Sequence, residues 1–114
     1  MPVPERRQHP RVHIEGLRAR VGPGRLELAV VDFGSGGVQC EGSVRFDYAE
    51  TSTIDVVSPD GTVLASLAAR PIYCRRVSEN PDSYRIGFAF VGVSNLDIQR
   101  SIQAIIRYQE SAAS

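Results

Sequence analysis

The feature that most constrains the fold of this chain is a series of short segments in which apolar and polar residues alternate. Successive side chains of an extended strand point to opposite faces, so such alternation is typical of half-buried β-strands. The alternating segments cover residues 11–20, 25–33, 38–42, 52–58, 62–77 and 84–93. Turn-forming residues, mainly glycine, proline, asparagine and aspartate, gather between most of them. We therefore predict six or seven short strands joined by turns.

Two of these segments contain a residue that interrupts a regular strand. In residues 11–20 the alternation passes through Gly16, where we expect a β-bulge within one continuous strand. In residues 62–77 Pro71 has no N–H to donate to a central ladder. We therefore expect this long strand to bend at the proline.

The period of the apolar residues changes after residue 93. Ile98, Ile102, Ile105 and Ile106 follow the spacing of one face of an α-helix, with polar residues between them. Just before them, a serine is followed three residues later by an aspartate, which favours a helix start with a capping box. The pattern predicts a C-terminal helix over residues 94–110.

Length and pattern together predict an all-β (mainly β) fold. The chain has 114 residues, near the common size of a single domain. A chain of this size buries roughly two-thirds of its unfolded surface, so one core suffices without metal or disulfide support. We predict a six- to seven-stranded antiparallel β-barrel over 12–92, because closure removes exposed strand edges, with the 94–110 helix covering one mouth. Residues 1–11 then form a flexible Arg-rich arm of this single domain, 1–114.

Charge and cysteine content argue against several classes of protein. The 13 basic residues, all of them arginine, balance 13 acidic ones, and a net charge of zero disfavours generic attraction to nucleic acid or membranes. No segment has the apolar length of a membrane span or the pattern of a signal peptide. Cys40 and Cys74 form no metal-binding spacing with His9 and His13 and lie among apolar or strand-like residues, so both are expected to be buried, reduced thiols. We therefore expect a cytoplasmic protein with no metal site and no membrane insertion.

The patterns of common catalytic sites are also missing. Both histidines lie near the start of the chain, and no pattern beside them suggests a nucleophile with its base. A phosphate-binding GxGxxG motif that began at Gly34 would need glycine where the chain has Gln39, and no GK[ST] follows. We expect neither enzymatic activity nor a cofactor.

Residues 5–12, ERRQHPRV, concentrate positive charge in an otherwise balanced chain. Arg6, Arg7 and Arg11 surround a His-Pro step, and the residue before a proline is driven away from helical conformation. An irregular arm of this kind could wrap an anionic ligand. Bidentate contacts from arginine to phosphate would offset the cost of ordering it, about 1–2 kcal/mol per residue.

Residues 30–37, VVDFGSGG, place a carboxylate at the end of an apolar strand, followed by small residues. Asp32 can accept hydrogen bonds from the N1–H and amino group of a guanine, and an arginine can bind the O6 and N7 edge of the same base. Glycines let a ligand approach the backbone closely. The two segments together suit a ligand that contains both phosphate and guanine.

These two segments, followed by the strand YRIGFAFV and a short helix, resemble the PilZ domain family. Members of this family are small β-barrels that bind the bacterial second messenger cyclic diguanylate (cyclic di-GMP, c-di-GMP), and their signatures are RxxxR and [D/N]xSxxG. The first signature is present as Arg7 to Arg11, with Arg6 just before it. The resemblance extends from residue 6 to about residue 108, and the joined motifs make it far more specific than RxxxR alone.

The second signature is present with one departure. Asp32 and Gly37 match it, but Gly34 stands at the serine position and the serine is displaced to Ser35. Loss of one neutral hydrogen bond costs about 0.5–1.5 kcal/mol, or roughly tenfold in affinity at most. We expect the flanking glycines to permit unusual backbone angles through which Ser35 brings its hydroxyl into the same space.

The resemblance implies a stand-alone bacterial c-di-GMP receptor, without catalysis, that signals through an unidentified protein partner. Arg7 and Arg11 would hold phosphates and a guanine edge, Arg6 would assist them, and Asp32 would recognise guanine. Ligand binding would order the N-terminal arm and change the surface shown to the partner. The expected ligand-binding residues are Arg6, Arg7, Arg11, Asp32, Gly34, Ser35, Gly36 and Gly37.

Other functions stay open. A family member that no longer binds the nucleotide would be a protein-interaction adaptor on the same fold. A β-barrel that binds nucleic acid would need a series of surface aromatics, which this chain lacks. Arg6 could also stack on a second guanine, so that the ligand binds as an intercalated dimer. We expect a monomer or weak dimer whose partner docks near Arg100, Gln103 and Arg107.

Overall fold

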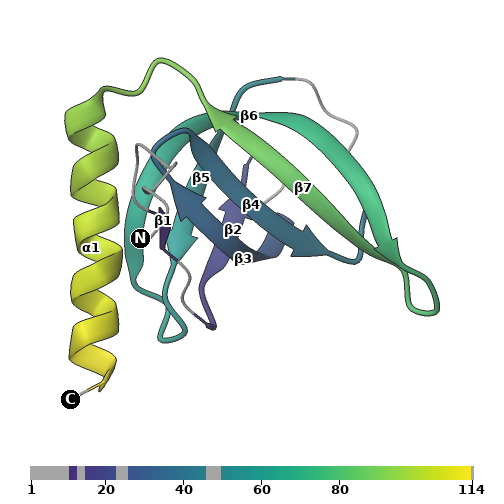
Figure 1. The fold of residues 1–114 in the computed structure, drawn as a ribbon, viewed down its shortest axis with the longest axis horizontal. Coiled ribbons are helices and arrows are strands. Elements are labelled where there is room, and N and C mark those ends of the chain that lie inside the picture. The colour runs from purple at the N-terminus through teal and green to yellow at the C-terminus, as the bar shows by residue number, and fades with distance from the viewer. Residues whose placement is uncertain (1–10, 13–14, 23–25, 46–49, 114) are drawn as a thin grey trace, which may run out of the picture.

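The computed structural model describes the whole chain except residues 1–10, 13–14, 23–25, 46–49 and 114. The described part contains seven strands followed by one helix (Figure 1). In chain order they are β1 (Arg11–Val12), β2 (Arg18–Val21), β3 (Leu26–Gly34), β4 (Gly37–Gly42), β5 (Ser52–Val57), β6 (Val63–Ser78), β7 (Ser83–Phe90) and α1 (Asn95–Ala113).

The strands form a closed antiparallel barrel. Around the barrel the order is β3-β2-β5-β6-β7-β4, and β4 pairs again with β3 to close it. The short strand β1 pairs with the end of β3. Six barrel strands with one C-terminal helix confirm the predicted all-β barrel, in which closure leaves few unpaired edges.

The prediction of one continuous strand over residues 11–20 is wrong. The structure has two strands there, because the chain turns at Gly16, whose φ of +88° is a left-handed conformation that favours glycine. Both strands pair with β3: β1 with its end at Phe33 and Gly34, and β2 with its first half. Between them, the Val30 N–H donates to the Leu17 carbonyl at 2.9 Å.

The core contains the apolar faces that the alternation predicts. Phe33 is fully buried and its ring lies 5.4 Å, centroid to centroid, from that of Phe90. The fully or nearly fully buried side chains include Leu17, just before β2, and in the strands Ala19, Leu28, Val30, Val38, Cys40, Ile54, Val56, Ile86 and Phe88. Because these side chains point inward, their immediate neighbours along each strand form the outer face of the barrel.

The helix begins where the sequence predicts and runs a few residues further. The Ser94 hydroxyl accepts a hydrogen bond from the Asp97 N–H at 3.1 Å, the geometry of an N-cap. Figure 1 shows α1 standing beside the barrel, where it contacts β6 and β1. Ile98, Ile102 and Ile105 are buried in the same hydrophobic cluster as the barrel residues, so the helix completes the core on this side.

The long strand β6 bends at the predicted proline. Its pairing with β5 ends at Ala69, and its pairing with β7 shifts register between Pro71 and Tyr73, so that Ile72 is the extra residue of a bulge. Beyond the bend, β6 and the start of β7 continue as a hairpin away from the barrel (Figure 1). The bend therefore lies across β7 from the start of β4, where the glycine-rich segment ends.

Candidate functional site

The glycine-rich segment is a tight hairpin turn on the rim of the barrel. Gly34 ends β3 and Gly37 begins β4, with Ser35 and Gly36 between them. The Gly36 carbonyl accepts a hydrogen bond from the Phe90 N–H at 3.1 Å. The turn is thereby attached to the last residue of β7.

The glycines of this turn provide close approach rather than unusual backbone angles. A Cβ added at Gly37 would lie 1.9 Å from the Phe88 carbonyl oxygen, so no larger residue fits there without a backbone shift. The described glycines with positive φ are found elsewhere in the chain, and Gly34 and Gly36 are not among them. Gly34 and Gly36 therefore do not use the left-handed angles that glycine permits, and a role of the Ser35 hydroxyl at the serine position stays a prediction.

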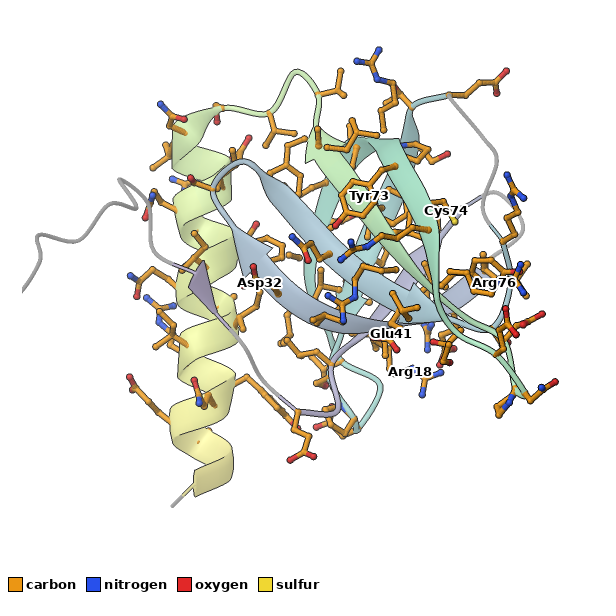
Figure 2. The ribbon with its side chains drawn as sticks, turned by 45° about the vertical axis from the view of Figure 1, so that its right-hand side comes forward. Arg18, Asp32, Glu41, Tyr73, Cys74 and Arg76 are labelled. Carbon is orange, nitrogen blue, oxygen red and sulfur yellow. The ribbon has the colours of Figure 1, made fainter. Side chains whose placement is uncertain are left out.

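Asp32 begins a row of residues that crosses four strands on the outer face. In the ladder pairing it stands opposite Gln39 of β4, Gln39 stands opposite Gly87 of β7, and Gly87 stands opposite Tyr73 of β6. Directly opposite residues of paired strands lie on the same face of a sheet. Asp32 is half-buried, and it and Tyr73 are labelled in Figure 2.

A second row, next to the first, consists mainly of small residues. Gly37 stands opposite Ala89, and Ala89 opposite Arg70. At the other end, Arg11 of β1 stands opposite Gly34 of β3. The backbone of Arg11, the last residue of the RxxxR motif, is thus brought to the glycine-rich turn.

The structure does not describe every predicted site residue. Arg6 and Arg7 lie outside the described residues, and of Arg11 only the backbone is described. The other predicted residues lie within six consecutive positions of the chain, at the rim of the barrel where β3 turns into β4: Asp32, Gly34, Ser35, Gly36 and Gly37. Their roles toward a ligand stay a prediction.

A pocket of about 170 Å³ opens beside the turn. Its floor is backbone and small residues, and its far wall is the bend of β6. The ring of Tyr73 covers Gly87, because a Cβ added at Gly87 would lie 2.1 Å from Cε2 of the tyrosine. The lining residues are Gly34, Gly36, Gly37, Val38, Gln39, Ile72, Tyr73, Gly87, Phe88 and Ala89.

Sequence reasoning predicted three of the ten lining residues of this pocket and missed the other seven. Gln39, Tyr73 and Gly87 were not predicted as site residues, although a glycine inside a strand often marks the close approach of another group. Gly87, within RIGFAF, therefore carried a usable signal. Tyr73 carried none, because only the bulge at Ile72 and the pairing with β7 place its ring over Gly87.

An ion pair lies one row away from the pocket, on the same outer face. Arg85 Nη2 donates to Glu41 Oε2 at 3.1 Å, and the Ser83 hydroxyl donates to Glu41 Oε1 at 2.9 Å. These two hydrogen bonds, that from Ser83 most strongly, hold the pKa of Glu41 below its usual value. The Arg85 guanidinium is paired with this carboxylate, so we assign Arg85 to the stabilisation of the sheet rather than to ligand binding.

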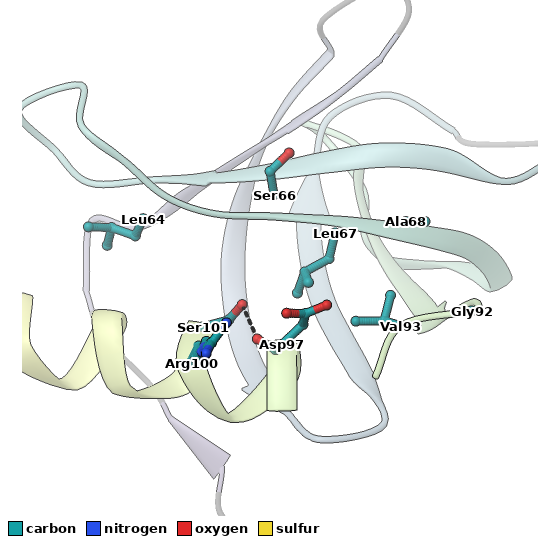
Figure 3. A pocket seen from close by; sticks show the side chains of 9 residues that line it. All are labelled: Leu64, Ser66, Leu67, Ala68, Gly92, Val93, Asp97, Arg100 and Ser101. Carbon is teal, nitrogen blue, oxygen red and sulfur yellow. Dashed lines mark hydrogen bonds between the residues drawn. The ribbon is translucent and has the colours of Figure 1, made fainter. Parts of the chain in front are cut away.

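A larger pocket of about 320 Å³ lies between β6 and the start of α1 (Figure 3). Its walls are Leu64 and Ser66 of β6 on one side and Asp97, Arg100 and other side chains of the helix on the other. The Ser101 hydroxyl donates to the Asp97 carbonyl at 2.9 Å beside it. Among the predicted ligand-binding residues that the structure describes, none lines this pocket.

Neither Cys40 nor Cys74 forms a disulfide. Burial raises the pKa of the Cys40 thiol to about 12, which makes it unreactive. Cys74 is only half-buried, so the expectation of a buried thiol is wrong for this residue. Within the described ranges, no group of three or more histidine, cysteine, aspartate or glutamate side chains could hold a metal ion. In the same part of the chain, no helix is both long and apolar enough to cross a membrane.

Comparison with known proteins identifies the fold. No protein-family model matches the sequence, and no curated protein matches it. The PilZ domain of YcgR from Escherichia coli, solved with c-di-GMP, superposes with a TM-score of 0.63 at 19% identity, over 96% of this chain and 98% of that one. Bacillus subtilis inhibitor of motility, MotI/DgrA, superposes with a TM-score of 0.66 at 15% identity, over 94% of this chain.

The chain spans about half the length of MotI/DgrA, of which 52% is covered, but nearly the whole YcgR domain. At this level of identity the likeness concerns the fold. The chain has the fold of a PilZ domain: a closed six-stranded antiparallel barrel with a C-terminal helix.

Proposed function

We propose that the chain is a receptor for c-di-GMP, without catalytic activity, and that the pocket beside the β3–β4 turn holds part of the ligand. The observation that carries the proposal is the pairing of β1 with β3, in which Arg11 stands opposite Gly34. This pairing brings the end of the RxxxR motif to the segment that starts at Asp32. Two motifs that suit phosphate and guanine therefore meet beside one pocket.

Each motif has its own task in this proposal. Arg7 and Arg11 bind the phosphates and one guanine edge, and Arg6 assists them. Asp32 accepts hydrogen bonds from the N1–H and amino group of guanine. The turn from Gly34 to Gly37, including Ser35 and Gly36, forms the floor over which the ligand lies.

The glycine at the serine position is compatible with binding. One neutral hydrogen bond contributes about 0.5–1.5 kcal/mol, whereas charge-assisted contacts from arginine to phosphate are roughly twice as strong each. Most of the binding free energy then comes from the arginines. The alternative is an adaptor that does not bind the nucleotide, and the departure at Gly34 is the observation that favours it.

The structural neighbours support a signalling role: one was solved with c-di-GMP, and the other is described as an inhibitor of motility. We propose that this chain likewise acts on a partner protein. Two adjacent hydrogen bonds link the proposed site to the strand that faces the helix: Phe90 N–H donates to the Gly36 carbonyl, and Val91 N–H donates to the Ala68 carbonyl of β6 at 3.0 Å. Ala68 lines the pocket beside α1, so a shift of the turn can reach the surface near Arg100.

Titration calorimetry tests the receptor function. The wild type is expected to release heat with c-di-GMP and not with cyclic di-AMP, and Arg7→Ala and Arg11→Ala are expected to weaken binding at least tenfold. Arg100→Ala is the matched control, because Arg100 is an exposed arginine beside the other pocket. No heat with the wild type would overturn the receptor and favour the adaptor. Binding that survives both substitutions would overturn the proposed site.

A further inference from the structure

Tyr73 is an aromatic side chain in an unusual place for this barrel. The bulge at Ile72 breaks the alternation of β6, so that Ile72 and Tyr73, although consecutive, are both exposed, at 59% and 38%. In a regular strand one of the two would point into the core. Bulges commonly re-aim a side chain next to a functional site.

The ring of Tyr73 lies against the backbone of Gly87. A Cβ at Gly87 would lie 2.1 Å from Cε2 of Tyr73 and 2.7 Å from both Cδ2 and Cζ, so only glycine leaves room for the ring. Gln39 stands on the other side of Gly87 in the same row. Neighbouring strands are about 4.8 Å apart, so the backbone positions of Tyr73 and Gln39 lie about 10 Å apart, and the ring over Gly87 spans about half of that distance.

The size of the pocket suits a single flat ring system. Its volume is about 170 Å³, whereas pockets that enclose a whole drug-sized ligand are typically about 300–1,000 Å³. An apolar cavity of about 150 Å³ is large enough to hold benzene. One base of a dinucleotide can therefore enter, while the sugars and phosphates stay outside over the barrel surface.

The surroundings of the ring suit the rest of such a ligand. Arg70 and Arg75 are exposed outer-face residues of β6 on either side of Tyr73. Gln39 and Asp32 lie on the opposite side of the pocket floor, where an amide and a carboxylate can meet the hydrogen-bonding edge of a base.

We propose that Tyr73 contacts the ligand directly: its ring stacks on one guanine base of the bound dinucleotide, which lies over Gly37 and Ala89 with its edge toward Gln39. This inference rests on the proposed function and adds a ligand-binding residue to it. An aromatic ring over a strand glycine can also serve the sheet alone, by covering exposed backbone. The experiment must separate these two roles.

Tryptophan fluorescence gives a direct readout of stacking, since the chain contains no tryptophan. Tyr73→Trp places a single fluorophore at the proposed contact, and c-di-GMP is expected to quench it as the base stacks. Val77→Trp is the matched control: Val77 is also exposed, lies at the second register shift of β6 and is not a lining residue of the pocket. Its fluorescence is expected to stay unchanged.

Affinity measurements on the same site complete the test. Tyr73→Phe keeps the ring and is expected to bind c-di-GMP like the wild type, whereas Tyr73→Leu is expected to lose about 5- to 100-fold in affinity. Equal binding by the leucine variant, or no quenching of the Tyr73→Trp protein while it binds, would overturn the stacking role and leave the receptor intact. A wild type that does not bind c-di-GMP would overturn both proposals.

Discussion

The pocket beside α1 and the pocket beside the β3–β4 turn differ in the residues that line them. The larger one, about 320 Å³, lies between β6 and α1 and has walls of side chains, including both an aspartate and an arginine. The smaller one, about 170 Å³, has a floor of glycine and alanine backbone between β3, β4 and β7, with Tyr73 at its edge. Volume alone would favour the first as a ligand site. The smaller pocket is favoured instead, because a flat ligand can approach its backbone floor closely and because two motifs suited to phosphate and guanine lie beside it.

A substitution at Gly37, on the floor of the smaller pocket, is expected to have the largest effect on stability and on binding. Gly37→Ala forces a Cβ to within 1.9 Å of the Phe88 carbonyl oxygen and is expected to lower the free energy of unfolding by about 3 kcal/mol, with loss of c-di-GMP binding. Gly36→Ala is the control, because its added Cβ meets nothing within 4 Å, and its change in stability should stay within about 0.5 kcal/mol. Chemical denaturation of both variants measures this. Equal stability of the two would contradict the close packing of β4 on β7.

An intermediate effect is expected when the missing hydroxyl is restored. Gly34→Ser is expected to tighten c-di-GMP binding by up to about tenfold, since one further neutral hydrogen bond becomes available. Calorimetry on Gly34→Ser, Ser35→Ala and the double variant measures how the two positions combine. An unchanged affinity in Gly34→Ser, together with weaker binding in Ser35→Ala, would assign the hydroxyl contact to Ser35 instead.

The smallest effect concerns the sheet that carries the smaller pocket. The pKa of Glu41 in the folded protein lies below the ordinary glutamate value of 4.5, so its interactions with Ser83 and Arg85 stabilise the fold above that pH. This contribution is expected to be lost as the pH falls below about 4.5 and through the lowered pKa of the folded state. Denaturation at several pH values should show that Glu41→Gln depends less on pH there than the wild type does. Identical pH profiles would remove Glu41 from the stabilising interactions of this face.

The sequence predicted the elements better than the contacts between them. Alternation located the strands and their inward faces, and isoleucine spacing located the helix, because both are local periodicities. The break at Gly16 was read as a bulge, since the sequence shows a glycine within an alternating segment but not that the chain turns there with a φ of +88°. The bend at Pro71 was predicted correctly, because a missing N–H acts at its own position.

The candidate site divides in the same way. Asp32 and the glycine-rich turn were found from the sequence, because a motif lies within one short segment. Tyr73 and Gly87 were not, because they are far apart along the chain and meet only through the register of β6 and β7.

Most of the strands, the face that each buries, the C-terminal helix and two short motifs thus follow from the order of the residues, because hydrophobic periodicity is a property of neighbouring residues. The folded barrel adds that Arg11 stands opposite Gly34, and that one row across four strands contains Asp32, Gln39, Gly87 and Tyr73. Register between distant strands is instead set by closure of the whole barrel and by bulges that move a side chain from one face to the other.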